Sequence, residues 1–315
     1  MRFFTKDKRR AKNENPEALL NLDPRLLLGG LPPALKFGEE HLGLLGRKLQ
    51  TLAGAVYLGE HTALCRILGV YKLYVDTRDI GFAANLLLDG YWELGMTLCV
   101  ARHVAAGMTA IDIGANFGYY TLLIGGLVGP TGRVYAIEPN PEAAAMLRCS
   151  LSLNGMTKRA RVIQAAAGAV DSSEVLLHVP HREPKNASVI TSPEAQPQNA
   201  GTLHRVRQVK LDTVICELDH VDFVKIDVEG SEEAVIAGLM EVLRRDKPCL
   251  VLEFNAARCQ DADALLAAMQ AIYGSLHYLD QCGNAVECDA QRLKSDCIGE
   301  DWLLFFSGPP KEGGV

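Results

Sequence analysis

Residues 108–121 read MTAIDIGANFGYYT, and this stretch decides the fold. It begins with a short apolar run that ends at Asp112, continues through Gly114 and Gly118, and opens into the apolar segment 119–127. A buried strand, a glycine turn and a helix in that order are typical of the start of a βαβ unit. The turn is then expected at the carboxyl end of the strand, where α/β sheets bind their ligands.

The same alternation continues toward the C-terminus. Helices are predicted over 119–127, 141–153, 230–245 and 261–272, and strands over 108–113, 132–137, 160–165, 221–226, 248–254, 275–279 and 302–306. Because these strands are almost continuously apolar, we predict an α/β fold with a mostly parallel, seven-stranded sheet that has helices on both faces. Residues 173–179 and 203–211 predict an inserted β-hairpin, whose long connection, 180–202, is rich in Pro, Asn and Ser.

The segment before this core is predicted to be an accessory region. Residues 1–73 are expected to form a mainly helical extension with a basic tail, 74–308 the main domain, and 309–315 a flexible tail. The expected elements of the N-terminal part are a helix over about 39–69, a short strand over 71–79 and a helix over about 80–105.

The composition is that of a globular protein with a large core. Of the 315 residues, 48% are hydrophobic and 22% charged, which excludes a mostly disordered or collagen-like chain. The formal net charge of −6 disfavours a nucleic-acid partner, since binding by bulk charge requires a basic surface. Residues 2–12 carry six basic side chains, which we interpret as a solvated terminus, with contact to an anionic surface as the alternative.

The cysteines and the hydropathy of the sequence indicate the cellular compartment in which the protein is expected. The nine cysteines include no CxxC pair, and the densest group, Cys282, Cys288 and Cys297, has the spacing of no standard zinc site. Idle thiols in a reducing cytosol are the simplest interpretation. Neither a signal peptide nor a transmembrane segment is predicted, so a cytoplasmic location is expected.

The glycine turn and the acid after the next strand predict a cofactor site. The spacing is GxxxG, and Asn116 occupies the place where a dinucleotide fingerprint has its second glycine. Asp112 suits a cationic ligand, such as the sulfonium or ammonium of S-adenosylmethionine, better than a diphosphate. Glu138 follows Gly114 by 24 residues and is placed to accept ribose hydroxyls. The alternatives are a purely structural glycine turn and an exposed loop acid.

A second group of acids follows later strands. The run 225–232 reads KIDVEGSE and places Asp227 and Glu229 at the end of one strand, while Glu253 ends the next. Three carboxylates at one crevice repel each other unless a cation or a proton compensates them, and Lys225 is a candidate cation. The alternative is a structural role in which Asp227 caps the helix that follows.

Together these residues resemble the FkbM-type methyltransferases, S-adenosylmethionine-dependent enzymes that mostly methylate hydroxyls of sugars and natural products. The resemblance spans about 74–306. Its most specific part is VDFVKIDVEGSEEAVIAG (221–238), and the other matching stretches are IDIGANFGYYT (111–121), EPNP (138–141), LSLNG (151–155), VIQAAAG (162–168), VKLDTVI (209–215) and LVLEFN (250–255). It implies a Rossmann-like class I methyltransferase fold and S-adenosylmethionine as the cofactor.

The resemblance also implies roles for individual residues. Glu138 would bind the ribose hydroxyls, with Pro139 and Asn140 beside it, and Ala165 and Ala166 would line the adenine. Glu93 would reach the cofactor from the N-terminal side, unless it is an ordinary surface glutamate. The residues that would hold the methionine half and the ribose, or begin the helix facing them, are Asp112, Gly114, Ala115, Asn116, Gly118, Tyr119, Tyr120 and Thr121.

The hypothesis for the reaction is methyl transfer to a hydroxyl of a small molecule or glycan, with Asp227 as general base. Glu229 or Glu253 would orient the acceptor, and Lys225 would tune their charge. A magnesium-assisted version would use Asp227, Glu253 and Asn255 as oxygen ligands. The remaining alternatives are a polyketide-like or peptide acceptor, a nicotinamide-dependent dehydrogenase, and a cofactor-binding scaffold without catalysis. A homo-oligomer is possible. Acceptor choice is expected to reside in the first 70 residues and in the loop 180–202.

Overall fold

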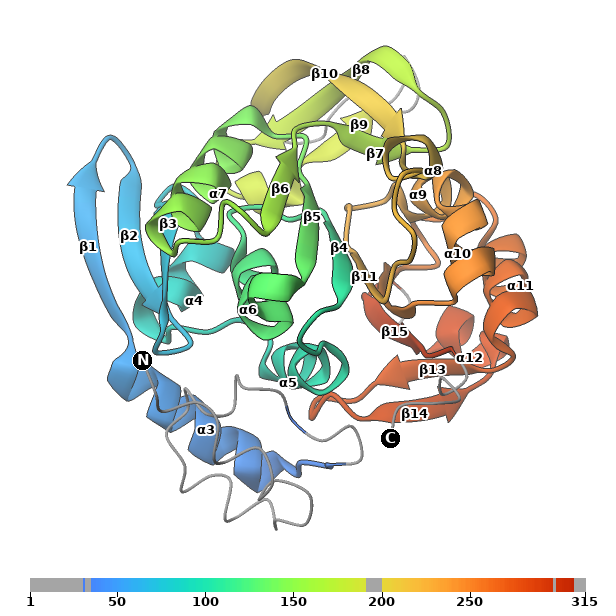
Figure 1. Cartoon of the computed structure of the whole chain (residues 1–315), viewed down its shortest axis with the longest axis horizontal. Helices are drawn as coiled ribbons and strands as arrows, with labels where there is room; N and C mark the ends of the chain where they lie inside the picture. Colours follow the sequence, from blue (N-terminus) through green and yellow to red (C-terminus); the bar gives the residue numbers. More distant parts are fainter. Residues whose placement is uncertain (1–30, 32–34, 191–199, 297–298, 309–315) are drawn as a thin grey trace.

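The computed structural model describes residues 31, 35–190, 200–296 and 299–308 (Figure 1). The basic residues at 2–12 and the tail predicted at 309–315 lie outside the described residues. The described part contains one large sheet with helices on both sides, a small N-terminal sheet and a third sheet inserted after the third parallel strand.

The large sheet carries the fold. Its strands are β4 (Thr109–Ile113), β5 (Arg133–Ile137), β6 (Ala160–Ile163), β11 (Phe223–Ile226), β12 (Cys249–Phe254), β13 (Leu276–Leu279), β14 (Ala285–Cys288) and β15 (Trp302–Phe306). They lie in the order β14-β13-β15-β12-β11-β4-β5-β6. The segment from β12 to β6 is parallel, and the other three strands extend it in antiparallel pairs. This is the Rossmann-like class I methyltransferase fold.

The sheet has eight strands where the sequence predicted seven. The additional strand is β14, which pairs with β13 across the turn at Gly283. It is a four-residue edge strand without a fully buried side chain. Its sequence therefore shows no apolar run, and only its pairing with β13 makes it a strand.

Two hydrophobic cores lie on the two faces of this sheet. Along β4, Ala110 belongs to one core and Ile111 and Ile113 to the other, because successive side chains of a strand point to opposite faces. The first core contains α5 (Leu94–His103), α6 (Tyr119–Val128) and α7 (Pro141–Leu153); the second contains α8 (Leu211–Val214), α9 (Glu232–Gly238), α10 (Met240–Asp246), α11 (Ala262–Tyr273) and α12 (Ala290–Ser295). In the described ranges, no helix has the length and apolar character to cross a bilayer.

The N-terminal region differs from its prediction. The helix α3 (Glu39–Leu52) ends well before residue 69, and an antiparallel sheet follows, formed by β1 (Gly54–Gly59), β2 (Thr62–Ile67) and β3 (Tyr71–Asp76). The helix predicted over 39–69 is therefore wrong after Leu52. Glu60 and His61 adopt positive φ angles and form the β1–β2 turn, and alternate residues of β2 are buried, which is a period of two.

The helix predicted over 80–105 is divided. It consists of α4 (Phe82–Leu88) and α5, which are separated at Gly90 (φ +73°) and Glu93 (φ +39°). The break matters for the site, because it turns the segment between the two helices toward the carboxyl ends of the parallel strands.

The predicted insertion is confirmed as a β-hairpin and is larger than expected. Its strands β8 (Ser172–Pro180) and β10 (Gly201–Lys210) pair antiparallel, and β7 (Ala166–Gly168) and β9 (Ser188–Ile190) complete a sheet in the order β7-β10-β8-β9. The segment 180–202, predicted as a loop, contains β9 and a short 3-10 helix, η2 (Pro184–Asn186). A second one, η1 (Gly129–Thr131), precedes β5.

Candidate active site

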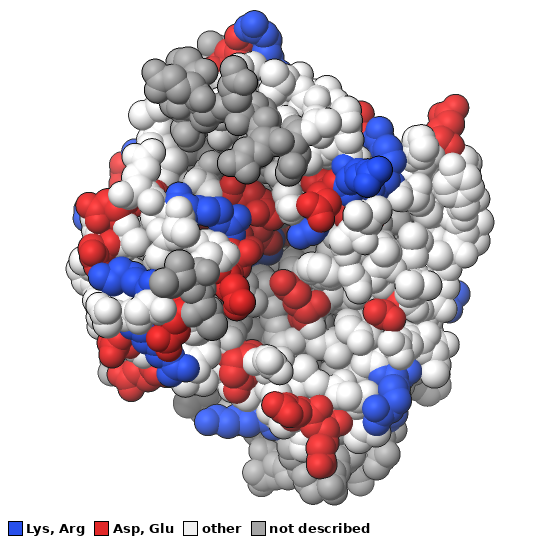
Figure 2. Space-filling view, turned by 180° about the vertical axis from the view of Figure 1, so that it is seen from behind, with Lys and Arg blue, Asp and Glu red and all other residues white. Residues whose placement is uncertain are grey.

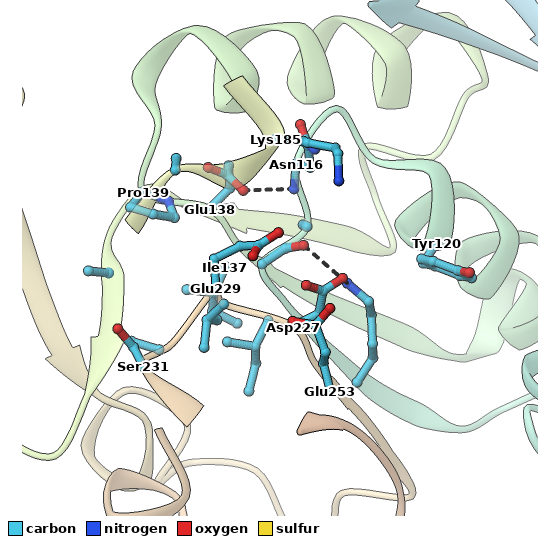
Figure 3. A pocket seen from close by; sticks show the side chains of 18 of the residues that line it. Asn116, Tyr120, Ile137, Glu138, Pro139, Lys185, Asp227, Glu229, Ser231 and Glu253 are labelled. Carbon is cyan, nitrogen blue, oxygen red and sulfur yellow. Dashed lines mark hydrogen bonds and ion pairs between the residues drawn. The ribbon is translucent and has the colours of Figure 1, made fainter. Parts of the chain in front are cut away.

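A pocket lies where the parallel strands β4, β5, β11 and β12 end (Figure 3). Its other walls come from the segment between α4 and α5 and from the insertion, including η2 and β9. Carboxyl ends of parallel strands leave backbone groups and loop side chains free to meet a ligand. On the face shown in Figure 2, acidic side chains gather around a hollow, with basic side chains interspersed.

Most of the predicted site residues meet in this pocket. Those that line it are Glu93, Gly114, Ala115, Asn116, Tyr119, Tyr120, Glu138, Pro139, Ala166, Lys225, Asp227, Glu229 and Glu253. Those that do not are Asp112, Gly118, Thr121, Asn140 and Ala165. The second group lies behind the lining, and each member has a structural contact of its own.

The glycine turn brings two loops into close approach. Gly114 has φ +77°, and a Cβ on it would lie 1.7 Å from the carbonyl oxygen of Asp227. Gly118 has φ +103°, and a Cβ there would lie 2.2 Å from Leu147. Neither position accepts a side chain, for conformational and for steric reasons. Gly114 therefore shapes the pocket, whereas Gly118 fits α6 against α7.

Asp112 lies beneath the turn. Its side chain is completely buried, accepts a hydrogen bond from Thr121 Oγ1 at 2.6 Å, and lies 3.7 Å from Lys225 Nζ. Burial raises the pKa of this carboxyl, and the charge of Lys225 lowers it. Lys225 also donates to the carbonyl oxygen of Gly114 at 3.2 Å. Asp112 therefore acts on the glycine turn indirectly: it lies near Lys225, and Lys225 donates a hydrogen bond to the turn at Gly114.

Glu138 is the buried acid at the end of β5. Its two carboxylate oxygens accept hydrogen bonds from the backbone N–H groups of Asn116, at 2.7 Å, and Asn140, at 2.8 Å. Burial raises its pKa to about 7, although both N–H donors and Lys225 act in the opposite direction. The Asn140 side chain is turned away and caps α7 by accepting from the Glu142 N–H at 3.0 Å.

Three carboxylates meet on the opposite wall. Ligand oxygens of Asp227, Glu229 and Glu253 lie within 4.8 Å of one another. Lys225 Nζ lies 3.0 Å from Asp227, and Arg258 lies 2.7 Å from Glu229 and 3.4 Å from Glu253. Burial, then the charges of Asp227 and Glu229, raise the pKa of Glu253 well above its usual range. Lys225 and Arg258 therefore compensate the charges of the three neighbouring acids.

Asn255, predicted as a third metal ligand, is not part of this cluster. Its amide donates to Gly299 and Asp301 at 3.1 and 2.9 Å, and its oxygen accepts from the Ala257 N–H. Glu229 occupies the place near the other two acids instead. Its φ of +55°, next to Gly230 at +102°, curves the loop back toward Glu253.

The segment before α5 supplies the remaining wall. Glu93 accepts a hydrogen bond from the Tyr120 hydroxyl at 3.0 Å, and burial raises the pKa of Glu93. Lys225 Nζ lies 5.3 Å from the centre of the Tyr120 ring. Glu93 therefore lines the pocket, in which it remains exposed to solvent. Ala166 lines the far end of the pocket, while Ala165 is buried in the second core.

Sequence reasoning missed two cations, Lys185 and Arg258. Lys185 belongs to η2 and lines the pocket; Arg258 follows β12 and pairs with the acids. Lys185 lies in the loop 180–202, which we expected from the sequence to govern acceptor choice. That expectation was the one signal in the sequence that pointed to this lysine. Arg258 follows the matched LVLEFN segment by three residues, but nothing in its local sequence pairs it with Glu229.

The fold and this pocket define a class I S-adenosylmethionine-dependent methyltransferase. The family described as "Methyltransferase FkbM domain" matches residues 112–283, more than half of the chain. The chain therefore belongs to the FkbM methyltransferase family, whose cofactor is S-adenosylmethionine.

The chain also shows similarities that cover less of its length or are more distant. A protein-L-isoaspartate O-methyltransferase of Aeropyrum pernix is 36% identical over 88 residues, which are 28% of this chain and 32% of that protein. One of Methanothrix thermoacetophila is 35% identical over 54 residues, or 17% of this chain and 26% of that protein. The chain matches a third or less of these relatives' length. A methyltransferase FkbM from Methylobacillus flagellatus gives a TM-score of 0.40 at 21% identity, over 64% of this chain and 43% of that structure.

Proposed function

We propose that this protein moves a methyl group from S-adenosylmethionine to a hydroxyl of a sugar-like acceptor, with Asp227 as general base. The observation that carries the proposal is the position of Asp227. It lies at the end of β11, lines the pocket with 36% of its side chain exposed, and contacts Lys225 at 3.0 Å. A hydroxyl acceptor must lose a proton as the carbon–oxygen bond forms, and Asp227 is more exposed to the pocket than Glu229 (21%) or Glu253 (14%).

The residues of the pocket fit this cofactor. Glu138 has remaining acceptor capacity beside its two backbone bonds, which suits the ribose hydroxyls. Ala166 leaves room for a flat ring at the adenine end. The bound sulfonium supplies an activated methyl group for in-line displacement. The chain then has to align the acceptor, exclude water and accept one proton, and effective positioning can supply ~7–11 kcal/mol of the barrier.

The acid cluster bears on the acceptor class. Lys225 and Arg258 already pair with the acids of the cluster, and an isoaspartate, named as the substrate residue in the curated relatives, would add a further carboxylate beside Asp227. A neutral polyol adds no such charge and offers hydroxyl donors to the carboxylates. The test is a mass-spectrometric screen of nucleotide sugars, glycolipids, polyketides and peptides for a mass increase of one methylene. Methylation restricted to peptides or to carboxyl groups would contradict the sugar proposal.

The alternative role of the same three acids is to bind a magnesium ion that assists methyl transfer. Asp227, Glu229 and Glu253 offer oxygen ligands at suitable separations, but Arg258 already pairs with two of them. We therefore expect transfer to the identified acceptor to persist after dialysis against a chelator. Loss of activity that returns with magnesium would establish the metal-assisted reaction instead.

Cofactor affinity is expected to increase with pH through about 7. Burial raises the pKa of Glu138 to about 7, and ribose hydroxyls donate to its ionised form. Below that pH the cofactor must displace a proton, so the affinity for S-adenosylhomocysteine should fall by up to about tenfold per pH unit. Calorimetric titrations between about pH 5.5 and pH 8 measure this. Glu138→Gln should bind weakly with no such slope; a flat wild-type profile would contradict the assignment.

The remaining expectations stay proposals. The described cysteines are free, and the cytoplasmic location expected from the sequence stays a prediction. The absence of a nucleic-acid partner and a possible homo-oligomer also stay predictions.

A further inference from the structure

A lysine of the insertion reaches into the cofactor pocket. Lys185 lies in η2 and lines the pocket (Figure 3), and its Nζ is 5.9 Å from the centre of the Trp92 ring, which lines the pocket too. Within the described ranges, no carboxylate lies at ion-pair distance from this ammonium. The other two cations of the site are both paired with carboxylates: Lys225 with Asp227, and Arg258 with Glu229. Lys185 is thus the cation still available to an anionic ligand.

A carboxylate borders the same end of the pocket. Glu93 follows Trp92 directly, lines the pocket, and is held by the Tyr120 hydroxyl. The charge of Lys185 acts on Glu93, although burial is the larger influence on its pKa. One ammonium and one carboxylate at this end are complementary to an amino-acid zwitterion. Glu138, the residue proposed to bind the ribose, lines the same pocket.

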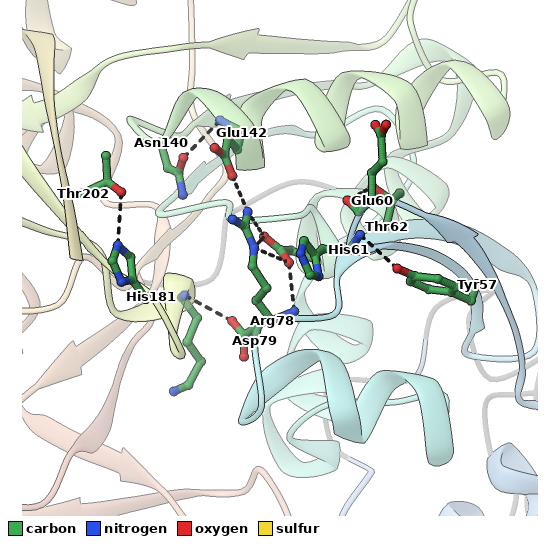
Figure 4. A network of polar contacts seen from close by, with 12 residues as sticks. Tyr57, Glu60, His61, Thr62, Arg78, Asp79, Asn140, Glu142, His181 and Thr202 are labelled. Atoms are coloured by element: carbon green, nitrogen blue, oxygen red, sulfur yellow. Dashed lines mark hydrogen bonds and ion pairs between the residues drawn. The ribbon is translucent and has the colours of Figure 1, made fainter. Parts of the chain in front are cut away.

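The backbone of Lys185 is held in place by Asp79, a buried acid of the segment before α4. One oxygen of Asp79 accepts from the Lys185 N–H at 3.2 Å (Figure 4). The other oxygen accepts from the N–H groups of Gly81 and Phe82. A Cβ at Gly81 would lie 3.1 Å from Lys185 Cε, so the lysine stem passes closely over this glycine. A cation held in this way loses little further freedom on binding a ligand.

We propose that Lys185 binds the α-carboxylate of the methionine moiety of S-adenosylmethionine, and that Glu93 faces its α-ammonium. The inserted sheet then forms part of the cofactor site, and Asp79 acts as a positioning residue for it. This inference rests on S-adenosylmethionine as the cofactor and is independent of which acceptor is methylated.

The test compares two ligands that differ by one group. Calorimetry measures the affinity of wild type and Lys185→Met for S-adenosylhomocysteine and for its decarboxylated analogue, which retains the amine. Since a hydrogen bond to a charged group contributes more than a neutral one, Lys185→Met should weaken S-adenosylhomocysteine binding about tenfold to a hundredfold. It should bind the decarboxylated analogue as well as wild type does. Lys185→Arg should restore most of the lost affinity.

The matched control is Arg182→Met. Arg182 is exposed, lies three residues earlier in the insertion and is not in the pocket lining. Its substitution removes the same charge and should leave both affinities unchanged. Unaltered S-adenosylhomocysteine binding by Lys185→Met would overturn the proposal and point to an anionic acceptor as the partner of Lys185. Equal weakening of both ligands would overturn it in favour of a structural role. Failure of wild type to bind either ligand would instead refute the cofactor itself.

Discussion

Asp227→Asn lowers the rate of methyl transfer by about 10²- to 10⁴-fold, the usual contribution of a general base. The amide has nearly the same shape as the carboxylate but cannot accept the acceptor's proton. The backbone of Asp227 is held by its N–H, which donates to the carbonyl oxygen of Ile113 at 3.1 Å, and Lys225 keeps its contact with the Gly114 carbonyl oxygen when the Asp227 carboxylate is replaced. The affinity for S-adenosylhomocysteine should therefore change by less than about threefold, within the spread of a single weak contact.

The comparison needs turnover and binding on the same preparations. Turnover is followed as S-adenosylhomocysteine release with the acceptor found in the screen, and binding by calorimetry. Asp263→Asn is the control, since this aspartate is on α11 with 73% of its side chain exposed. Undiminished turnover of Asp227→Asn would refute the general-base role. Parallel loss of turnover and cofactor binding would show that Asp227 holds the cofactor instead.

Gly114→Ala is expected to abolish cofactor binding and to destabilise the fold. Alanine at φ +77° costs ~1–2 kcal/mol, and its Cβ would overlap the Asp227 carbonyl oxygen at 1.7 Å. The two loops must separate to admit it, and forced repacking costs a further ~1–3 kcal/mol. Because both loops line the pocket, the affinity for S-adenosylhomocysteine should fall by at least about a hundredfold, or ~2.7 kcal/mol.

Gly155→Ala separates the conformational cost of alanine at a positive φ from the cost of steric overlap with a neighbouring atom. Gly155 has a similar φ of +66°, but no atom lies within 4 Å of the position a Cβ would take. Its substitution should cost only the conformational ~1–2 kcal/mol and leave cofactor affinity intact. Denaturant unfolding gives the free energies, and calorimetry gives the affinities. Equal destabilisation by both substitutions, with binding preserved in Gly114→Ala, would show that the close approach to Asp227 does not shape the pocket.

Errors in the sequence-based prediction occurred where local patterns compete. One helix was predicted over about 39–69, yet positive φ angles at Glu60 and His61 and the alternating burial of β2 show a hairpin after Leu52. The edge strand β14 has no apolar run of its own. In both segments, pairing with a neighbouring strand decides the structure, and a single segment does not contain that information.

The sequence by itself determined the parallel part of the sheet and the places of the main site residues after the carboxyl ends of its strands. Strand, glycine turn and helix are local patterns, and parallel strands bring the residues after them to one edge; this placed Gly114, Glu138, Asp227 and Glu253 around one pocket. Only the tertiary structure decided which charges meet. It turned Asn255 away, brought Arg258 to the acids, and placed Lys185 from the insertion opposite Trp92. Such pairings depend on contacts between distant segments, so no local pattern encodes them.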